Sequence, residues 1–230
     1  MKTILALILA RGGSKGIPRK NLVPVCGKPL IYYSIQQALR SKHITRTIVS
    51  TDDPEIAETS RALGAEVPFI RPEDISRDDS TDLQAFQHAL TWLEDKEAYS
   101  PELIVHLRPT GPVRQVAIVD DAIDRMLADE SADSLRSVSV AQQTPYKMWT
   151  LDGDFLKPVH SLPERQESFN APRQSLPVAY WQNGYVDIVR PRIIKQGLMS
   201  GEKILSYVTD EPILEIDYIE TIPLVEEALR

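Results

Sequence analysis

Near its start the chain has seven consecutive apolar residues, Ile4 to Ala10, and a glycine-bearing loop begins directly after them at Arg11. An uninterrupted apolar run is typical of a strand whose two faces are both buried, as in a parallel sheet covered by helices on both sides. Ligands of such sheets bind beyond the carboxyl ends of the strands. The opening segment therefore predicts an α/β fold with a functional loop after its first strand.

Strand and helix patterns alternate beyond this run. Expected strands cover residues 47–51, 67–70, 103–107 and 135–140, and expected helices cover 30–39, 54–63, 81–93 and 118–127. Asp53 and Pro54 are typical of a helix start, because Asp caps the first turn and proline suits the first helical position. The alternation predicts a single Rossmann-like domain over residues 1–230, with a doubly wound, mostly parallel sheet.

The regular pattern is lost between Gln142 and Gln182, where five prolines and several aromatic residues lie without a clean period. Long irregular segments often carry function, although some are passive connections. We predict a smaller insertion over residues 142–182 that covers substrate or mediates dimerisation, and a passive connection is the alternative. Regular structure is expected to resume with a strand over 185–189 and a helix over 218–229.

Charge is distributed unevenly along the chain. Residues 1–51 hold nine Lys and Arg and no acid, whereas the rest holds all 33 Asp and Glu against 17 basic residues. A short cationic block on an otherwise anionic chain favours a small polyanion over nucleic acid. The single Cys26 excludes an internal disulfide framework, and the apolar run is too short to cross a bilayer. We expect a cytoplasmic protein with no nucleic-acid or membrane partner.

The loop over residues 11–21 reads Arg-Gly-Gly-Ser-Lys-Gly-Ile-Pro-Arg-Lys-Asn. Three glycines let backbone amides approach a ligand closely, and four cations beside them suit a polyphosphate. The spacing matches neither G-x-x-x-x-G-K-[ST] nor G-x-G-x-x-G, which disfavours a kinase-type P-loop and a dinucleotide fingerprint. A solvated turn is the alternative to a phosphate-binding loop.

Residues 10–21, followed by Gly-Lys-Pro-Leu at 27–30, resemble the nucleotide loop of the acylneuraminate cytidylyltransferases, the CMP-sialic acid synthetase family. Further segments similar to this family follow in order at 49–53, 66–72, 108–114, 172–177, 183–184 and 215–217. The resemblance implies a nucleotidyltransferase that moves CMP from CTP to the anomeric hydroxyl of a nonulosonic, sialic-acid-like 2-keto sugar acid and releases pyrophosphate.

The resemblance also implies roles for single residues. Phosphoryl chemistry depends on positioning and charge stabilisation, and Arg11 and Lys20 are the implied catalytic cations. Nucleotide contacts are implied for Ala10, Arg11, Gly12, Gly13, Lys15, Lys20, Asn21, Arg71 and Ser80.

A Mg²⁺ cofactor is expected, because this ion binds through one or two carboxylates and substrate phosphates. Glu215 and Asp217 match the family's acidic pair, although members often carry Asp at the first position. Alternate residues of an extended segment point to the same side, which suits a shared ion. A solvated acidic strand end is the alternative.

Planar recognition of the acceptor's carboxylate favours arginine. Arg173 matches the family's sugar-acid position, and Lys147 and Tyr180 are further candidates; a structural salt bridge is the alternative for Arg173. Arg108 stands where sialic-acid enzymes commonly have a glutamine that reads the sugar. Arg108 is therefore assigned to the sugar site, and the acceptor could be a related acid such as legionaminate, pseudaminate or an unacylated keto-deoxy sugar.

Other functions stay open from the sequence. One is transfer to an eight-carbon keto-sugar or from another NTP, and another, of a different class, is a non-catalytic nucleotide-binding module. The resemblance further implies a homodimer whose irregular region reaches the neighbouring site, with Trp149, Phe169 and Trp181 as apolar contacts.

Overall fold

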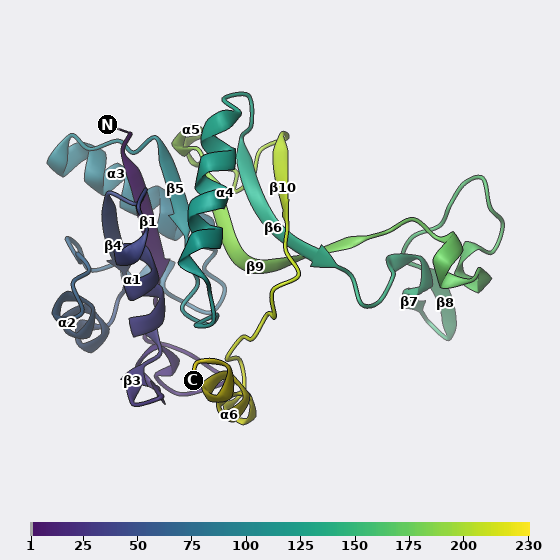
Figure 1. Ribbon diagram of the computed structural model, residues 1–230, viewed down its shortest axis with the longest axis horizontal. Coiled ribbons are helices and arrows are strands. Elements are labelled where there is room, and N and C mark those ends of the chain that lie inside the picture. The colour runs from purple at the N-terminus through teal and green to yellow at the C-terminus, as the bar shows by residue number, and fades with distance from the viewer. Residues whose placement is uncertain (1) are drawn as a thin grey trace.

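The apolar opening run forms β1 (Ile4–Leu9), which lies inside a six-stranded sheet in the computed structural model, where residues 2–230 are described (Figure 1). The strand order is β10 (Ile204–Val208), β6 (Ser134–Val140), β9 (Tyr180–Val189), β5 (Leu103–His106), β1 and β4 (Arg46–Ser50). β1 pairs in parallel with β4 and β5, and β10 with β6, whereas β9 is antiparallel to both neighbours. The predicted mostly parallel α/β sheet is confirmed.

Alternate side chains of β1 enter two separate cores. Ile4, Ala6 and Ile8 pack with α1 (Ile31–Arg40), α2 (Pro54–Ala62) and α4 (Val116–Ala128) on one face of the sheet. Leu5 and Leu7 pack with α3 (Asp82–Glu97) and α5 (Pro191–Lys195) on the other. Because both faces are covered, every position of the strand is apolar.

The start of α2 follows the predicted capping chemistry. The Asp53 carboxylate accepts hydrogen bonds from the amides of Glu55 and Ile56, with Pro54 at the first helical position of α2. Thr81 and Gln84 form a reciprocal capping box at the start of α3. Among the described residues, no helix is long and apolar enough to span a bilayer.

Three expectations for secondary structure were wrong. Residues 67–70 form no strand, and only Glu66 bridges Ile48 there, because Pro68 lacks the amide that a ladder needs. β9 begins at Tyr180, within the expected insertion, and β10 was not foreseen. The C-terminal helix is shorter than expected: α6 (Ile222–Ala228) follows a 3₁₀ turn, Ile219–Thr221, and packs near the small hairpin of β2 (Pro24–Val25) and β3 (Lys28–Pro29).

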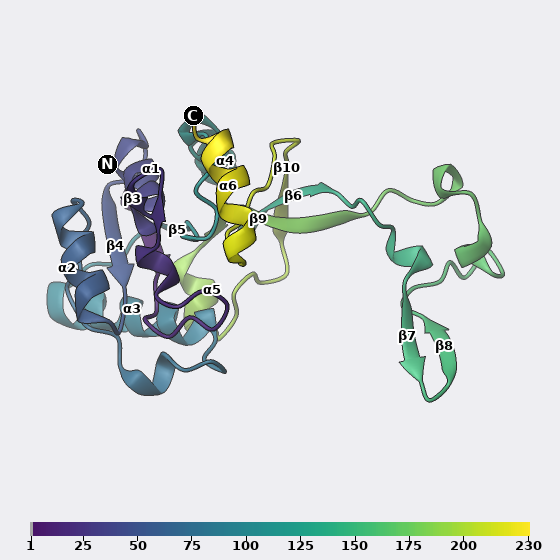
Figure 2. The same ribbon diagram turned by 90° about the horizontal axis from the view of Figure 1, so that it is seen from below.

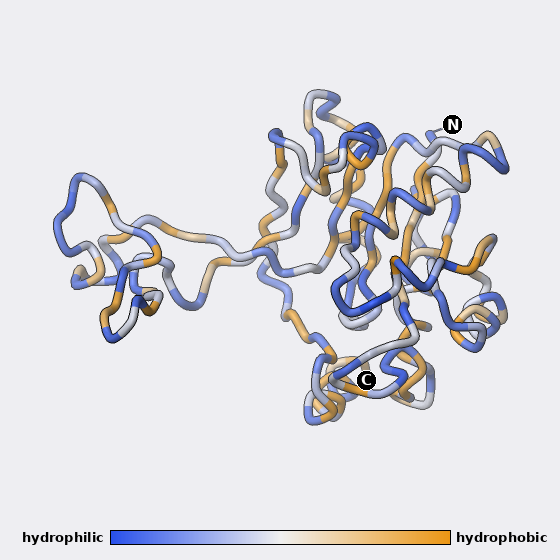
Figure 3. Tube along the Cα trace, turned by 180° about the vertical axis from the view of Figure 1, so that it is seen from behind, coloured by the Kyte–Doolittle hydropathy of each residue, from blue (hydrophilic) through white to orange (hydrophobic). Residues whose placement is uncertain are grey.

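Residues 141–179, here called the arm, project away from the sheet (Figure 2). The arm contains the hairpin of β7 (Trp149–Asp152) and β8 (Phe155–Pro158), which irregular patterning had hidden. Gly153 and Asp154 form its two-residue turn, with Gly153 at φ +60°. Hydrophobic stretches occur on the arm as well as in the sheet (Figure 3), and on the arm they are exposed: Leu151 at 79% and Phe155 at 77%.

Candidate active site

A cavity of about 450 Å³ opens at the carboxyl ends of β1 and β5. Its walls come from the 11–21 loop, the loop after β5, the first residue of α3, and the segment around Asp217. A second cavity of about 270 Å³ shares Leu9, Arg11 and Asp82 with the first and extends to Arg71 and Ser80. Segments far apart in the sequence therefore meet at the sheet edge where ligands of α/β proteins bind.

Backbone contacts fix the glycine loop. The Gly12 amide donates to Asp52 Oδ1 (2.9 Å), and a Cβ at Gly12 would lie 2.9 Å from the Asp53 side chain. The side-chain Nδ2 of the buried Asn21 closes the loop by donating to the Arg11 carbonyl (3.0 Å). A Cβ at Gly16 would meet the Asp217 carbonyl at 2.8 Å. The glycines thus allow the acidic C-terminal segment to lie directly against the loop.

Three loop cations contact carboxylates from distant parts of the chain. Arg11 Nη1 and Lys15 Nζ pair with Asp78 at 3.0 and 2.7 Å, and Lys20 Nζ pairs with Asp217 at 2.9 Å. Lys15, followed by Arg11, holds the pKa of the Asp78 carboxyl below its usual value. The Lys20 side chain is only 18% exposed, so its direction toward Asp217 is well defined.

Arg71 is a buried guanidinium with few partners. It is 5% exposed, its Nε and Nη2 have no hydrogen-bond partner among residues 2–230, and Asp52 lies 3.8 Å away. Burial lowers its pKa. Since an unsatisfied buried charge is costly, a guanidinium lining a cavity in this state suits an anionic ligand. Ser80, beside it, accepts from the Arg77 amide (2.9 Å) and shapes the adjoining loop.

The acidic pair lies on an extended segment that is not part of the sheet. Between the two acids, the buried Ile216 donates its amide to the Thr110 carbonyl (2.8 Å). Burial, and then the charge of Asp217, raises the pKa of Glu215. Among the described residues no cluster of three or more His, Cys, Asp and Glu forms a metal site. Asp217 lies against the loop, whereas Glu215 lines a separate small pocket with Arg114 and Gly184. The oxygen donors of both side chains are of the kind that Mg²⁺ takes, with its other ligands from water and phosphates.

His106 is a cavity residue that the sequence analysis did not single out. It ends β5, is 3% exposed, and meets Phe86 edge to face at 5.2 Å. Burial, and then the nearby Arg108 charge, holds its pKa well below the usual value. Its position at a strand end was the signal that could have identified it. Asp82, Thr110 and Tyr218 line the same cavity and were also missed.

The structure separates the predicted sugar-site residues. Arg108 lines the main cavity and contacts Asp82 (3.3 Å) and the buried Asp187 (3.1 Å). Arg173 lies on the arm, where its Nη2 donates to the Ala141 carbonyl (3.2 Å). Lys147 is exposed on the arm, and Tyr180 is half exposed at the start of β9. Arg173, Lys147 and Tyr180 are thus absent from the walls of both cavities described above.

The other predicted residues gather at the sheet edge. Arg11, Lys15, Lys20, Asn21 and Asp217 line the main cavity, and Arg71 and Ser80 line the adjoining one. Ala10, Gly12 and Gly13 are the chain neighbours of Arg11 just after β1, and Glu215 lies beside Arg108 at Gly184.

Solved structures resemble this chain in its fold. The CMP:2-keto-3-deoxy-manno-octonic acid synthetase complexed with CTP matches with a TM-score of 0.71 at 14% identity, over 99% of this chain and 98% of that one. A 4-diphosphocytidyl-2C-methyl-D-erythritol synthase from Anaerococcus prevotii matches with a TM-score of 0.67 at 13% identity, over 99% and 98%. At these identities the likeness establishes the fold.

The sequence matches the family model described as cytidylyltransferase over residues 5–184, so the chain belongs to the cytidylyltransferase family. It is 37% identical over 127 residues to a pseudaminic acid cytidylyltransferase of Campylobacter jejuni, which is 55% of this chain and 54% of that protein. It is 33% identical over 157 residues to the CMP-N,N'-diacetyllegionaminic acid synthase of Legionella pneumophila, 67% and 66% respectively.

A third relative, N-acylneuraminate cytidylyltransferase A of Danio rerio, is 30% identical over 97% of this chain and 50% of that protein. The chain thus spans about half to two thirds of the length of these curated relatives. All three are cytidylyltransferases or CMP-sugar synthases of the kind that the sequence resembles, which confirms the resemblance.

Proposed function

We propose that this protein transfers CMP from CTP to the anomeric hydroxyl of a nonulosonic 2-keto sugar acid and releases pyrophosphate. The observation that carries the proposal is the convergence of Arg11, Lys15 and Lys20 with Asp217 around one cavity at the sheet edge. The names of the relatives support both the nucleotide and the class of acceptor.

The reaction makes a bond from the anomeric oxygen to the α-phosphorus and breaks the bond from that phosphorus to the bridging oxygen of pyrophosphate. The protein's task is to position the two reactants and to stabilise the negative charge that develops. Lys20, little exposed and held toward the cavity, is suited to the leaving pyrophosphate. Arg11 and Lys15 lie on the same loop, and Arg71 offers unsatisfied donors in the adjoining cavity.

Glu215 and Asp217 are the residues that would hold Mg²⁺. When bound, the ion would neutralise charge on the phosphate oxygens. Asp217 is half exposed and accepts from Lys20 through Oδ1, and both residues line the cavity. The longer Glu215 is half buried beside Gly184, where the missing side chain leaves room for its carboxylate.

The two alternatives have less support. Transfer to an eight-carbon keto-sugar is suggested by a structural neighbour, but at 14% identity that neighbour supports the fold alone. A non-catalytic nucleotide-binding module would have no use for the Lys20–Asp217 pair or for a half-buried acid beside it.

We further propose that the protein works as a homodimer in the cytoplasm. The arm exposes Leu151, Phe155 and Val178 and carries Arg173 away from the cavity of its own chain. Burial of these apolar side chains against a second copy would remove them from water and could bring Arg173 to the partner's sugar site. CTP as substrate and the exposed Cys26 fit the cytoplasm.

The test is an incubation of the protein with each of the four NTPs, Mg²⁺ and a panel of eight- and nine-carbon 2-keto sugar acids, with pyrophosphate release as the readout. We expect release with CTP and a nine-carbon acid. Release only with an eight-carbon acid or another NTP would favour the first alternative, and no release with any combination would favour the binding module.

A further inference from the structure

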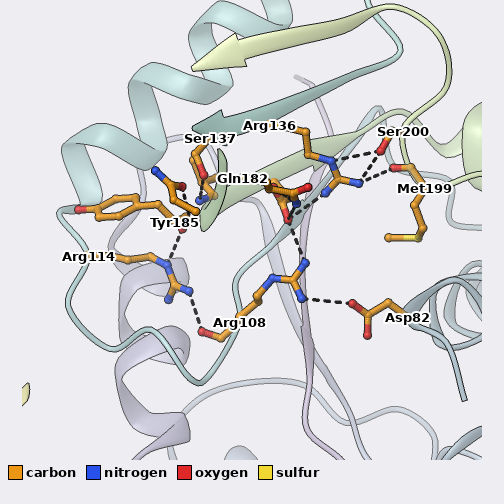
Figure 4. A network of polar contacts seen from close by, with 12 residues as sticks. Asp82, Arg108, Arg114, Arg136, Ser137, Gln182, Tyr185, Met199 and Ser200 are labelled. Carbon is orange, nitrogen blue, oxygen red and sulfur yellow. Dashed lines mark hydrogen bonds and ion pairs between the residues drawn. The ribbon is translucent and has the colours of Figure 1, made fainter. Parts of the chain in front are cut away.

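A buried carboxylate contacts Arg108, a residue of the cavity wall. Asp187, on β9, is 3% exposed, and its Oδ2 lies 3.1 Å from Arg108 Nη2 and 2.8 Å from Arg136 Nη1. Gln182 Nε2 donates to the same carboxylate (3.2 Å). Figure 4 shows Arg108 and Arg136 approaching each other from the loop after β5 and from β6, with Asp82 in contact with Arg108.

A bulge in β9 makes this arrangement possible. β9 pairs with β6 at Arg136↔Asp187 and next at Val138↔Gln182, so the register advances by two residues on β6 and by five on β9. The extra residues loop out between them and are held by side chains, since Ser137 Oγ accepts from the Val186 amide (2.9 Å). Bulges re-aim side chains, and here the bulge places Gln182 on Asp187 although they are five positions apart.

Arg136 is held in place by several partners within the chain. Arg136 donates from Nε and Nη2 to Ser200 Oγ and from Nη2 to the Met199 carbonyl, while Nη1 faces Asp187. One buried carboxylate therefore lies between two guanidinium groups. The charge of Arg136 offsets that of Asp187, and at the cavity wall Arg108 pairs with the half-exposed Asp82, with Glu215 also beside it.

Arg108 is also held at its backbone and along its stem. Arg114, buried, donates from Nη2 to the Arg108 carbonyl (2.7 Å) and from Nε to the Tyr185 carbonyl. Gly184 has φ +67°, and a Cβ there would lie 3.5 Å from Arg108 Nε and 3.3 Å from Glu215 Oε1. The guanidinium of Arg108 is thus confined between the bulge and the cavity.

We propose that Asp187, held by Arg136 and Gln182, is a positioning residue that orients Arg108. Arg108 then determines which sugar acid is used. It selects one that places a hydrogen-bond-accepting oxygen, of a carboxylate or a carbonyl, against the guanidinium. The inference rests on the proposed function for the identity of the acceptor. A guanidinium only donates hydrogen bonds, so the same position rejects a free ammonium group.

Steady-state kinetics of Asp187→Asn, Arg108→Gln and the double variant test the inference. Asp187→Asn is expected to raise the KM for the sugar acid at least about tenfold while the KM for CTP changes less than about twofold. In the Arg108→Gln background, Asp187→Asn should raise the KM for the sugar acid by less than about a further twofold, because Asp187 acts through Arg108. Equal rises in both KM values, or additive effects, would overturn the inference.

Two further variants guard against a purely structural effect. Asp133→Asn, which removes an Asp–Arg pair (2.8 Å to Arg192) just before β6, should leave the KM for the sugar acid unchanged. Gln182→Met keeps both ion pairs of Asp187 and should raise the KM for the acid about threefold, which keeps the inference testable if Asp187→Asn does not fold.

A measurement independent of turnover separates this inference from the proposed function. In ¹⁵N-arginine-labelled protein, the Arg108 Nε–Hε signal, assigned by its loss in Arg108→Gln, should shift when a nine-carbon keto acid is added and should broaden in Asp187→Asn. A shifted signal without CTP turnover would contradict the proposed reaction and leave the positioning role standing. An unshifted signal in an active wild-type enzyme would overturn the positioning role.

Discussion

The cavity side of the molecule and the arm differ in whether their side chains have partners within the chain. Around the cavity, charged side chains are held by buried strands and by partners within the chain, as Lys20 is by Asp217 and Arg108 by Asp187. On the arm, large apolar side chains such as Leu151 and Phe155 are exposed, and both strands of the hairpin that carries them are exposed along their length.

The difference indicates which parts of the molecule are complete in one chain. The cavity is preorganised, because each cation that lines it is already directed by a contact from another element. The arm exposes apolar side chains of a kind that is uncommon on isolated chains, which is the basis of the proposed homodimer. The predictions below probe the cavity side first and the arm afterwards.

The largest effect is expected from the loop cation that the structure holds most firmly. Lys20→Ala should lower turnover by about 100- to 1,000-fold, the scale of a lost contact to developing charge. Asp217→Ala should also lower turnover at least about a hundredfold, because it removes both the partner of Lys20 and an expected metal ligand. Initial rates of pyrophosphate release measure both.

Lys42→Ala is the matched control for Lys20→Ala. Lys42 is also a lysine in an ion pair, with Asp124 at 3.3 Å, but it is 64% exposed and lies outside the cavity. Its removal should leave turnover within about twofold. Near-normal activity of Asp217→Ala would show that the metal assignment is wrong.

The next effect contrasts the two apolar environments. Leu7→Ala should lower the free energy of unfolding by about 3 kcal/mol, because Leu7 is fully buried against α3 and a cavity would remain. Leu151→Ala, made in the same way on the arm, should cost less than about 0.5 kcal/mol in dilute protein. Urea denaturation of both variants checks the pair. Similar losses would mean that the arm folds against the body of its own chain.

The sequence predicted the cavity side better than the arm for a physical reason. β1 and its loop are visible because burial on both faces forces an unbroken apolar run and the loop carries its chemistry in consecutive residues. The hairpin β7–β8 has a weaker pattern, although the Gly153–Asp154 turn between two short strands was a usable signal.

Contacts between distant residues could not be read from the sequence by local pattern. Lys20 and Asp217 are 197 positions apart, and their pairing depends on a close approach at Gly16. The bulge that joins Gln182 to Asp187 depends on side-chain hydrogen bonds between two strands. The family resemblance named Arg11, Lys20 and Asp217, which line one cavity, but also Arg173, which lies on the arm. It did not name Asp187 and Gln182, whose contacts depend on the bulge.

The arm should respond most strongly to protein concentration. Phe155→Asp places a charge in the middle of the exposed apolar hairpin, and we expect self-association to weaken at least about tenfold, since a buried aromatic anchor often contributes more than 1 kcal/mol to an interface. Sedimentation velocity over a concentration series measures the change. A wild-type chain that remains monomeric at all concentrations would contradict the proposed homodimer, and the activity of the variant would then show whether the arm serves its own cavity.

The smallest effect is a pH dependence that arises on the cavity side alone. In the fold, burial and then the charges of Arg108, Arg136 and Arg114 hold the pKa of His106 well below 6.5, whereas the unfolded chain takes up this proton near its ordinary value. The unfolded state therefore binds more protons in this window, so the free energy of unfolding falls as pH decreases below about 6.5, by at most about 1.4 kcal/mol per pH unit for one group. His106→Gln should reduce this slope, and His88, whose pKa burial also lowers, should account for part of what remains. Urea denaturation of wild type and variant at about pH 7 and about pH 5.5 measures the difference; equal slopes would mean that His106 takes up its proton in the folded state.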